Sequence, residues 1–208
     1  MINAINLIDV MDGLAGGIAS IAALVLFLRS FWFDQVSIAV LPLSLLACLL
    51  AFLRWNFHPA RVFMGSSGAM LLGYWLAVSS TIGGAKVGTA FVLLGLPILD
   101  TAWVIARRLA GRRSPFHGGD QEHLPHRLYG LGLSHLQTVV LLYCFTAVFG
   151  LLALGLHSPA AGPPPGKLLL IIGMVGTVGA MLGLVTQLSV RRSRREHPSP
   201  SDENPSTR

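Results

Sequence analysis

Four polar residues open the chain at intervals of three. They are Asn3, Asn6, Asp9 and Asp12, within the segment "NAINLIDVMDG". In a helical turn or tight loop this spacing places them on one side. Amide and carboxylate oxygens are ligands suited to Mg²⁺ held near a phosphate. Asp12 before Gly13 also fits a turn that caps the next helix, but a cap needs only one acid, so the spacing favours a site.

A glycine-containing segment, "RVFMGSSGAMLLG" at 61–73, enters a long apolar stretch through Gly65 and Gly68. Small residues at a helix start let backbone N–H groups approach an anion. Small residues are equally typical of close helix packing in membranes. The sequence leaves these two interpretations open.

The segment 107–132 carries five arginines and three histidines, among them His123, His126 and Arg127. Arginine matches phosphate oxygens in a fork geometry, and histidine can donate to a phosphate or transfer a proton. Pro125 fits the first turn of a short helix that would aim His126 and Arg127 together. No third and fourth ligand is evident for zinc at the His123-x-x-His126 spacing.

Asp100 lies inside an apolar segment, in "LPILD". An acid within a membrane span is a functional candidate. It could instead pair with Arg107 or Arg108, about two turns further along. Both interpretations stay open.

The composition predicts an integral membrane protein. The chain of 208 residues is 53% hydrophobic and only 12% charged, against about 25% charged in a typical soluble domain. Stretches of about 20 apolar residues cross a bilayer core. We therefore expect an all-α, polytopic transmembrane helical bundle of about six spans, at 13–33, 35–53, 62–85, 87–106, 136–156 and 168–190.

The two cysteines, Cys48 and Cys144, fall inside these spans, so no disulfide or metal role is expected for them.

Nearly all arginines fall in loops on one side of these spans, whereas the other side has Lys86 and Lys167. The positive-inside rule places the arginine-rich side, with both termini, in the cytoplasm. The Asn/Asp opening, the Gly65–Gly68 turn and the histidine loop then share the cytoplasmic face of the inner (plasma) membrane. The basic residues that give the net charge of +6 lie mostly on this membrane face. Membrane orientation therefore explains the charge, which argues against nucleic acid as a partner.

Two regions are expected: a transmembrane domain at 1–190 and a disordered tail at 191–208. The tail is basic at first and then rich in proline and serine, a composition typical of disorder. Its arginines could bind anionic membrane lipids, although such clusters also commonly flank a last span.

Three segments together resemble the polyprenyl-phosphate N-acetylhexosamine-1-phosphate transferase family. They are "NAINLIDVMDGLAGG", "ARVFMGSSGAMLLG" and "PILDTAWVIARRLAGRRSPFHGGDQEHLPHRL". The resemblance implies a polytopic enzyme that transfers a sugar-1-phosphate from a UDP-sugar to a polyprenyl phosphate and releases UMP, with Mg²⁺. Such enzymes serve cell-envelope polysaccharide or peptidoglycan precursor synthesis.

The resemblance also implies residue roles. Asn6 matches the asparagine that contacts magnesium, Asp9 an acid essential for the chemistry, and Asp12 an acid near the uridine. Asn3 and Ser66 fall at substrate-binding positions. His123, His126 and Arg127 match the basic loop that holds the pyrophosphate or the sugar.

Three departures qualify the resemblance: Ser66 stands where the family has an acidic metal ligand, Pro125 replaces a histidine, and Val10 replaces a glycine. The resemblance covers the C-terminal portion of the family fold, without its early spans and their Asp-Asp pair. We therefore expect the chain alone to be weakly active or inactive. The alternatives are a catalytically inactive relative that binds UDP-sugar or lipid phosphate, and one subunit of a split enzyme whose partner chain supplies the missing spans.

Overall fold

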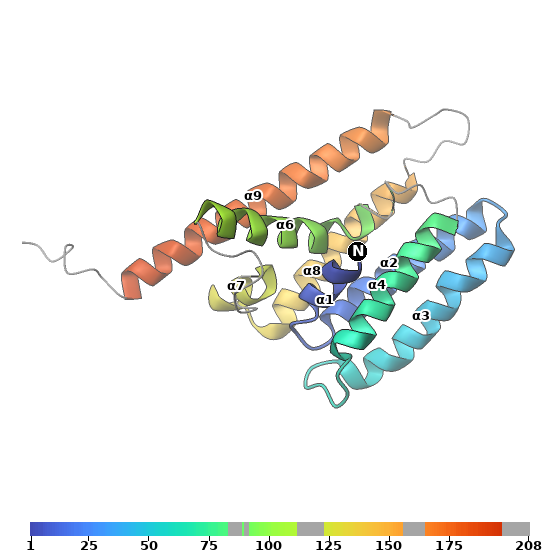
Figure 1. Cartoon of the computed structure of the whole chain (residues 1–208), viewed down its shortest axis with the longest axis horizontal. Helices are drawn as coiled ribbons and strands as arrows, with labels where there is room; N and C mark the ends of the chain where they lie inside the picture. The colour runs from blue at the N-terminus through green and yellow to red at the C-terminus, as the bar shows by residue number, and fades with distance from the viewer. Residues whose placement is uncertain (83–88, 90–91, 112–122, 156–164, 197–208) are drawn as a thin grey trace, which may run out of the picture.

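The structure is a computed structural model that describes residues 1–82, 89, 92–111, 123–155 and 165–196. Every regular element among these residues is a helix (Figure 1), which confirms the predicted all-α class. The helices are α1 (Ile2–Ile8), α2 (Leu14–Trp32), α3 (Val36–Asn56), α4 (Gly65–Ile82), α6 (Gly95–Ala110), α7 (Leu124–Gly130), α8 (His135–Gly155) and α9 (Pro165–Glu196).

Helix α2 is the central helix of the bundle. It packs against α3, α4 and α8, and most of its length is buried. Its first half is rich in small residues, which let neighbouring helices approach closely. A Cβ atom on Gly17, for example, would lie 1.9 Å from the Tyr143 ring of α8. The contact with α8 therefore depends on glycine at this position.

Four helices are long and apolar enough to cross a membrane, by length and composition: α2, α3, α8 and the Ile171–Ser189 part of α9. They match four of the six predicted spans. The remaining two predicted spans contain helices α4 and α6, which have 18 and 16 residues. Helix α6 begins at Gly95 rather than near residue 87, and its 16 residues extend about 24 Å, less than the roughly 30 Å of a bilayer core. Membrane crossing by α4 and α6 stays a prediction.

The first residues of the chain form a short helix, one of the two conformations that the sequence left open. Ile2–Ile8 form helix α1, which packs along α4. A Cβ atom on Gly73 would lie 2.7 Å from the Ile2 Cα atom, so α1 begins beside the middle of α4 (Figure 1). The physical reason is that Ala4, Ile5 and Ile8 form a buried apolar face. The cytoplasmic position of the N-terminus stays a prediction.

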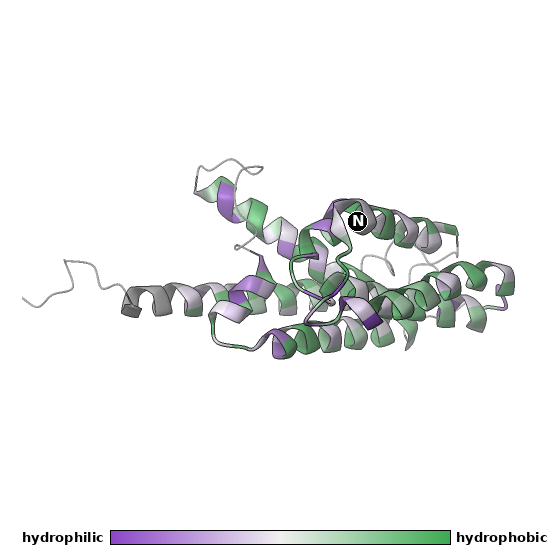
Figure 2. Ribbon diagram, turned by 90° about the horizontal axis from the view of Figure 1, so that it is seen from below, coloured by the Kyte–Doolittle hydropathy of each residue, from purple (hydrophilic) through white to green (hydrophobic). Residues whose placement is uncertain are grey.

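Helices α6 and α7 lie beside the long helix α9 (Figure 1). Hydrophobic residues cover most of the long helices, whereas hydrophilic residues appear on α7 and toward the end of α6 (Figure 2). Helix α9 continues to Glu196, so the predicted domain boundary at residue 190 falls within this helix. The rest of the predicted tail, 197–208, lies outside the described residues.

Candidate functional site

The loop between α1 and α2 carries both candidate acids and is held at Gly13. Gly13 adopts the left-handed conformation, with φ +77°, which favours glycine. Its N–H donates to Asn56 Oδ1 at 3.1 Å, and its carbonyl accepts from the Tyr143 hydroxyl. Asn56, at the end of α3, also donates from Nδ2 to the Val62 carbonyl at 2.9 Å. This buried amide therefore joins loop 9–13 to loop 57–64.

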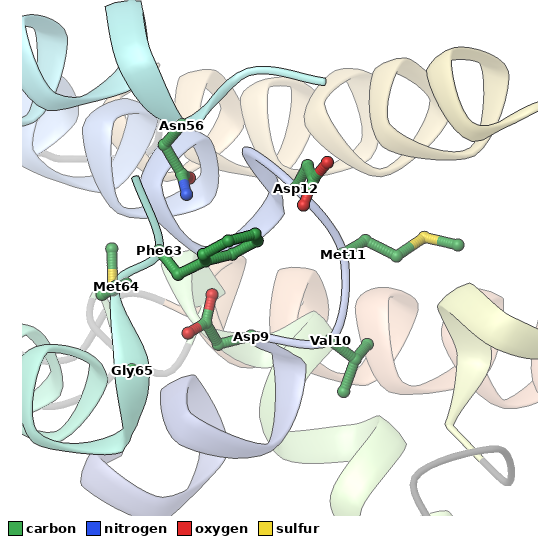
Figure 3. A pocket seen from close by; sticks show the side chains of 8 residues that line it. All are labelled: Asp9, Val10, Met11, Asp12, Asn56, Phe63, Met64 and Gly65. Carbon is green, nitrogen blue, oxygen red and sulfur yellow. The ribbon is translucent and has the colours of Figure 1, made fainter. Parts of the chain in front are cut away.

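Asp9 follows the last residue of α1 and faces a cavity of about 260 Å³. This Asp9 cavity is lined by Asp9, Val10, Met11, Asp12, Asn56, Phe63, Met64 and Gly65. The Asp9 carboxylate points toward Phe63, whereas the Val10 and Met11 side chains point away from it (Figure 3). Burial raises the pKa of Asp9, because removing water disfavours the charged carboxylate.

Helix α4 begins at this cavity. Gly65 lines it and is left-handed, with φ +68°, and Ser66 is exposed in the first turn of the helix. A Cβ atom on Gly68 would lie 2.8 Å from the Met64 Cγ atom. This contact is local, within the segment that enters α4, so both interpretations of the segment stay open.

The three-residue spacing of the polar residues does not produce one continuous face. Asn3 and Asn6 lie one turn apart on α1, and Asn3 is exposed while Asn6 is half-buried. Neither lines the Asp9 cavity. The helix ends at Ile8, so Asp9 and Asp12 lie in the following loop. Ligand roles for Asn3 and Asn6 stay predictions.

Asp12 does not cap α2, because the N-cap residue is Gly13 and no side chain caps this helix. Its Oδ2 instead accepts from the Ala60 N–H at 3.1 Å and lies 3.0 Å from His58 Nδ1. Burial alone would raise the pKa of Asp12, but the Ala60 N–H, His58 and His135 together lower it. The cap interpretation is therefore wrong for this residue.

The residues of α7 point in different directions. The helix forms as predicted, with Pro125 in its first turn. His126 lines a second cavity, of about 610 Å³, together with Asp12, His58, Tyr129, Ser134, His135 and neighbouring apolar residues; we call it the His58 cavity. Arg127 is buried and donates from Nη2 to the Leu182 carbonyl at 3.2 Å and to the Thr186 hydroxyl of α9. The expectation that His126 and Arg127 aim together is wrong.

His123 contacts an acid within the fold. Its Nδ1 lies 2.9 Å from Asp100 Oδ2, and Asp100 Oδ1 accepts from the Leu124 N–H at 3.0 Å. Both side chains are about 95% buried. These bonds give Asp100 a structural role, which neither alternative for this residue had included: Asp100 fixes the start of α7. Arginines 112 and 113 and His117 of the predicted basic loop lie outside the described residues.

Two histidines of the site were not predicted from the sequence: His58 and His135. Their rings stack with centroids 4.4 Å apart, and both line the His58 cavity with Asp12. Each stands at the boundary of a predicted span on the face that holds the other polar residues. That shared position was the signal in the sequence that could have drawn attention to them.

A sequence model of glycosyl transferase family 4 matches residues 1–84. The chain is 35% identical over 191 residues to a probable undecaprenyl-phosphate N-acetylglucosaminyl 1-phosphate transferase of Bacillus subtilis, covering 89% of this chain and 53% of that protein. Residues 1–84 therefore resemble glycosyl transferase family 4, and the similarity to this relative extends over most of the chain.

Other relatives match to a similar extent. A decaprenyl-phosphate N-acetylglucosaminephosphotransferase of Mycolicibacterium smegmatis is 34% identical, over 90% of this chain and 51% of that protein. An undecaprenyl-phosphate alpha-N-acetylglucosaminyl 1-phosphate transferase of Thermotoga maritima is 32% identical, over 74% and 48%. The chain therefore spans about half the length of these relatives. That it corresponds to their C-terminal half stays a prediction.

Proposed function

We propose that this chain belongs to glycosyl transferase family 4 and forms part of a membrane transferase that moves an N-acetylhexosamine-1-phosphate from a UDP-sugar to a polyprenyl phosphate. The names of the relatives support the lipid phosphate and the sugar phosphate. The activity would serve synthesis of cell-envelope polysaccharide or peptidoglycan precursors. We place the site at the cytoplasmic face of the inner membrane, where the arginine-rich loops predict it.

One observation carries the proposal: the polar Asp9 cavity adjoins an apolar groove. The groove, of about 380 Å³, lies between α3 and α4 and is lined by Leu45, Cys48, Leu49, Phe52, Phe63, Met64, Gly68, Leu71, Leu72 and Trp75. Phe63 and Met64 line both spaces. A phosphate attached to a long hydrocarbon needs a polar and an apolar site side by side. This pair of spaces supplies both.

The donor set of the Asp9 cavity fits Mg²⁺. Asn56 Oδ1 and Asp12 Oδ2 are engaged by backbone N–H groups, which leaves Asp9 as the carboxylate directed into the cavity (Figure 3). Mg²⁺ is usually held by one or two carboxylates, water and substrate phosphates. Asp9 would hold the ion, and the ion would supply charge neutralisation at the diphosphate. The resemblance assigns Asn6 to the ion as well, and this side chain, which does not line the cavity, would have to turn toward it.

In the proposed reaction, an oxygen of the lipid phosphate forms a bond to the phosphorus that carries the sugar. The bond from that phosphorus to the UMP oxygen breaks, and UMP leaves. The attacking oxygen is an ionised oxygen of the lipid phosphate, and Asp9 acts by positioning the phosphates together with the ion. We assign substrate contacts to Asn3, Ser66, Asp12 and His126, which their sequence positions support. His123 and Arg127 are engaged within the fold and would act by positioning α7, which carries His126.

The test is transfer of labelled N-acetylglucosamine phosphate from its UDP-sugar to polyprenyl phosphate in proteoliposomes. The chain is assayed alone and with membranes of its source organism that lack it. We expect weak or no turnover alone and Mg²⁺-dependent turnover with a partner, lost in Asp9→Asn. Ser66→Asp alone should not restore activity to the isolated chain. Uridine-nucleotide binding without turnover under any condition would support the inactive-relative alternative instead.

A further inference from the structure

We infer that Asp12, His58 and His135 form a binding site for a transition-metal ion of the zinc class, separate from the proposed Mg²⁺ position at Asp9. One carboxylate oxygen and one ring nitrogen from each histidine lie within 4.8 Å of one another. Tetrahedral zinc with bonds of about 2.0–2.1 Å separates its ligand atoms by about 3.3 Å. The three ligand atoms are therefore near enough for side-chain movement, chiefly rotation of one histidine ring, to bring them onto one ion.

The three ligands come from three separate segments. Asp12 lies in the loop before α2, His58 in the loop after α3, and His135 at the first residue of α8. The Ala60 N–H holds the Asp12 carboxylate in place at 3.1 Å. A backbone donor to a ligating carboxylate is the kind of outer contact that orients ligands in metal sites. An ion here would join the three segments.

The histidine that must move most has room to do so. The rings of His58 and His135 stack at an interplanar angle of 24°, so one ion cannot lie in the plane of both rings until one ring turns. The His58 side chain is 58% exposed and lies on a loop. Rotation of this ring replaces its contact with Asp12 by a shared ion, and the adjoining His58 cavity leaves space for water as a fourth ligand.

The ligand types favour zinc over a hard cation. Arg54 and Arg61 line a neighbouring space together with His58, and their positive charge opposes any divalent ion, so the selectivity must come from the ligands. Mg²⁺ and Ca²⁺ prefer oxygen ligands. Imidazole nitrogens bind Zn²⁺ well while they are neutral. A set of two histidines and one aspartate is therefore selective for zinc-like ions.

The experiment is a Zn²⁺ titration of the purified full chain in nanodiscs by calorimetry, after treatment with a chelator. We expect one Zn²⁺ per chain. His58→Gln and His135→Gln should each weaken binding more than about 100-fold, because loss of an outer-shell partner alone weakens it about 10- to 100-fold. Zn²⁺ should also raise the melting temperature of the original chain but not that of His58→Gln.

Two control variants test other zinc ligands. The exposed Cys48 and Cys144 are changed together to serine, and His126, which lines the same cavity outside the ligand group, is changed to glutamine. Both should keep the tight site. Binding that is unchanged in His58→Gln and His135→Gln, or absent from the original chain, would overturn the inference. Neither nucleotide nor lipid is present, so this outcome is independent of the transferase proposal.

Discussion

Asp100 of α6 and His123 at the start of α7 are 23 positions apart, and their side chains meet at 2.9 Å in the buried interior. The Leu124 N–H donates to the other oxygen of the same carboxylate. A single acid therefore binds both a side chain and the first helical backbone group of α7. This explains how a helix of seven residues, too short to be stable alone, keeps its position.

Asp100→Ala is expected to destabilise the chain by about 3–5 kcal/mol, because it leaves a buried partner without its counterpart. His123→Ala should cost a similar amount, and the double variant should cost much less than the sum of the two. Thermal melting in detergent measures the effect. Asp34→Asn, at an exposed turn residue with φ 54°, is the matched control and should change little. Additive effects would show that the pair is not coupled.

Gly17→Ala should destabilise the chain by about 1–3 kcal/mol. Its Cβ would lie 1.9 Å from the Tyr143 ring, so the ring must move and its hydroxyl must leave the Gly13 carbonyl. Gly176→Ala on α9 has nothing within 4 Å of the added Cβ and should be neutral or slightly stabilising, since alanine favours helices. Equal melting temperatures for the two variants would contradict the close approach of α2 and α8.

Asp9→Asn should raise the melting temperature at neutral pH while it abolishes transfer. The pKa of Asp9 is raised in the folded chain by burial, so the folded state binds the proton more tightly than the unfolded state does. Stability therefore falls as pH rises through the interval between the two pKa values. The variant lacks this penalty, and its advantage should vanish below the ordinary value of 3.8.

Asp12→Asn provides the opposite case. The pKa of Asp12 is lowered on balance by the Ala60 N–H and the nearby histidines, against the effect of burial. The ionised form therefore stabilises the fold at neutral pH, and this contribution is lost as pH falls through the lowered pKa. Melting curves from pH 3 to 8 should show Asp12→Asn below the original chain at neutral pH. A shift in the same direction as that of Asp9→Asn would contradict the assigned environments.

Arg127→Met should destabilise the junction of α7 and α9 by about 1–3 kcal/mol, because it removes the donor to the Leu182 carbonyl and the Thr186 hydroxyl. A residue that only contacted substrate would change the KM of the transferase and leave the melting temperature unaltered. Arg107→Met, in the last turn of α6, is the matched control. An unchanged melting temperature for Arg127→Met would restore the interpretation of Arg127 as a substrate ligand.

The helical class and four of the spans could be predicted from the sequence, because a run of about 20 apolar residues is typical of a helix that crosses a membrane. Helix α1 could not be distinguished from a loop, because its asparagines fit a polar loop as well and hid the apolar spacing of Ala4, Ile5 and Ile8. The acids of the site were found from their residue types and spacing. Their partners were not: the approach of His58 to Asp12, and of Asp100 to His123, depends on packing between segments that are far apart in the chain.

The Asn56 side chain uses both ends of its amide, one for Gly13 and one for Val62. Loop 9–13 must break its own bond to Asn56 to swing outward, and loop 57–64 must break the other, whereas both loops can move together with Asn56 without breaking either. Joint movement of the two walls is therefore the easier motion, and the Gly13 amide hydrogen should exchange with solvent only when its bond to Asn56 opens. The width of the cavity would then be kept nearly constant while its position shifts.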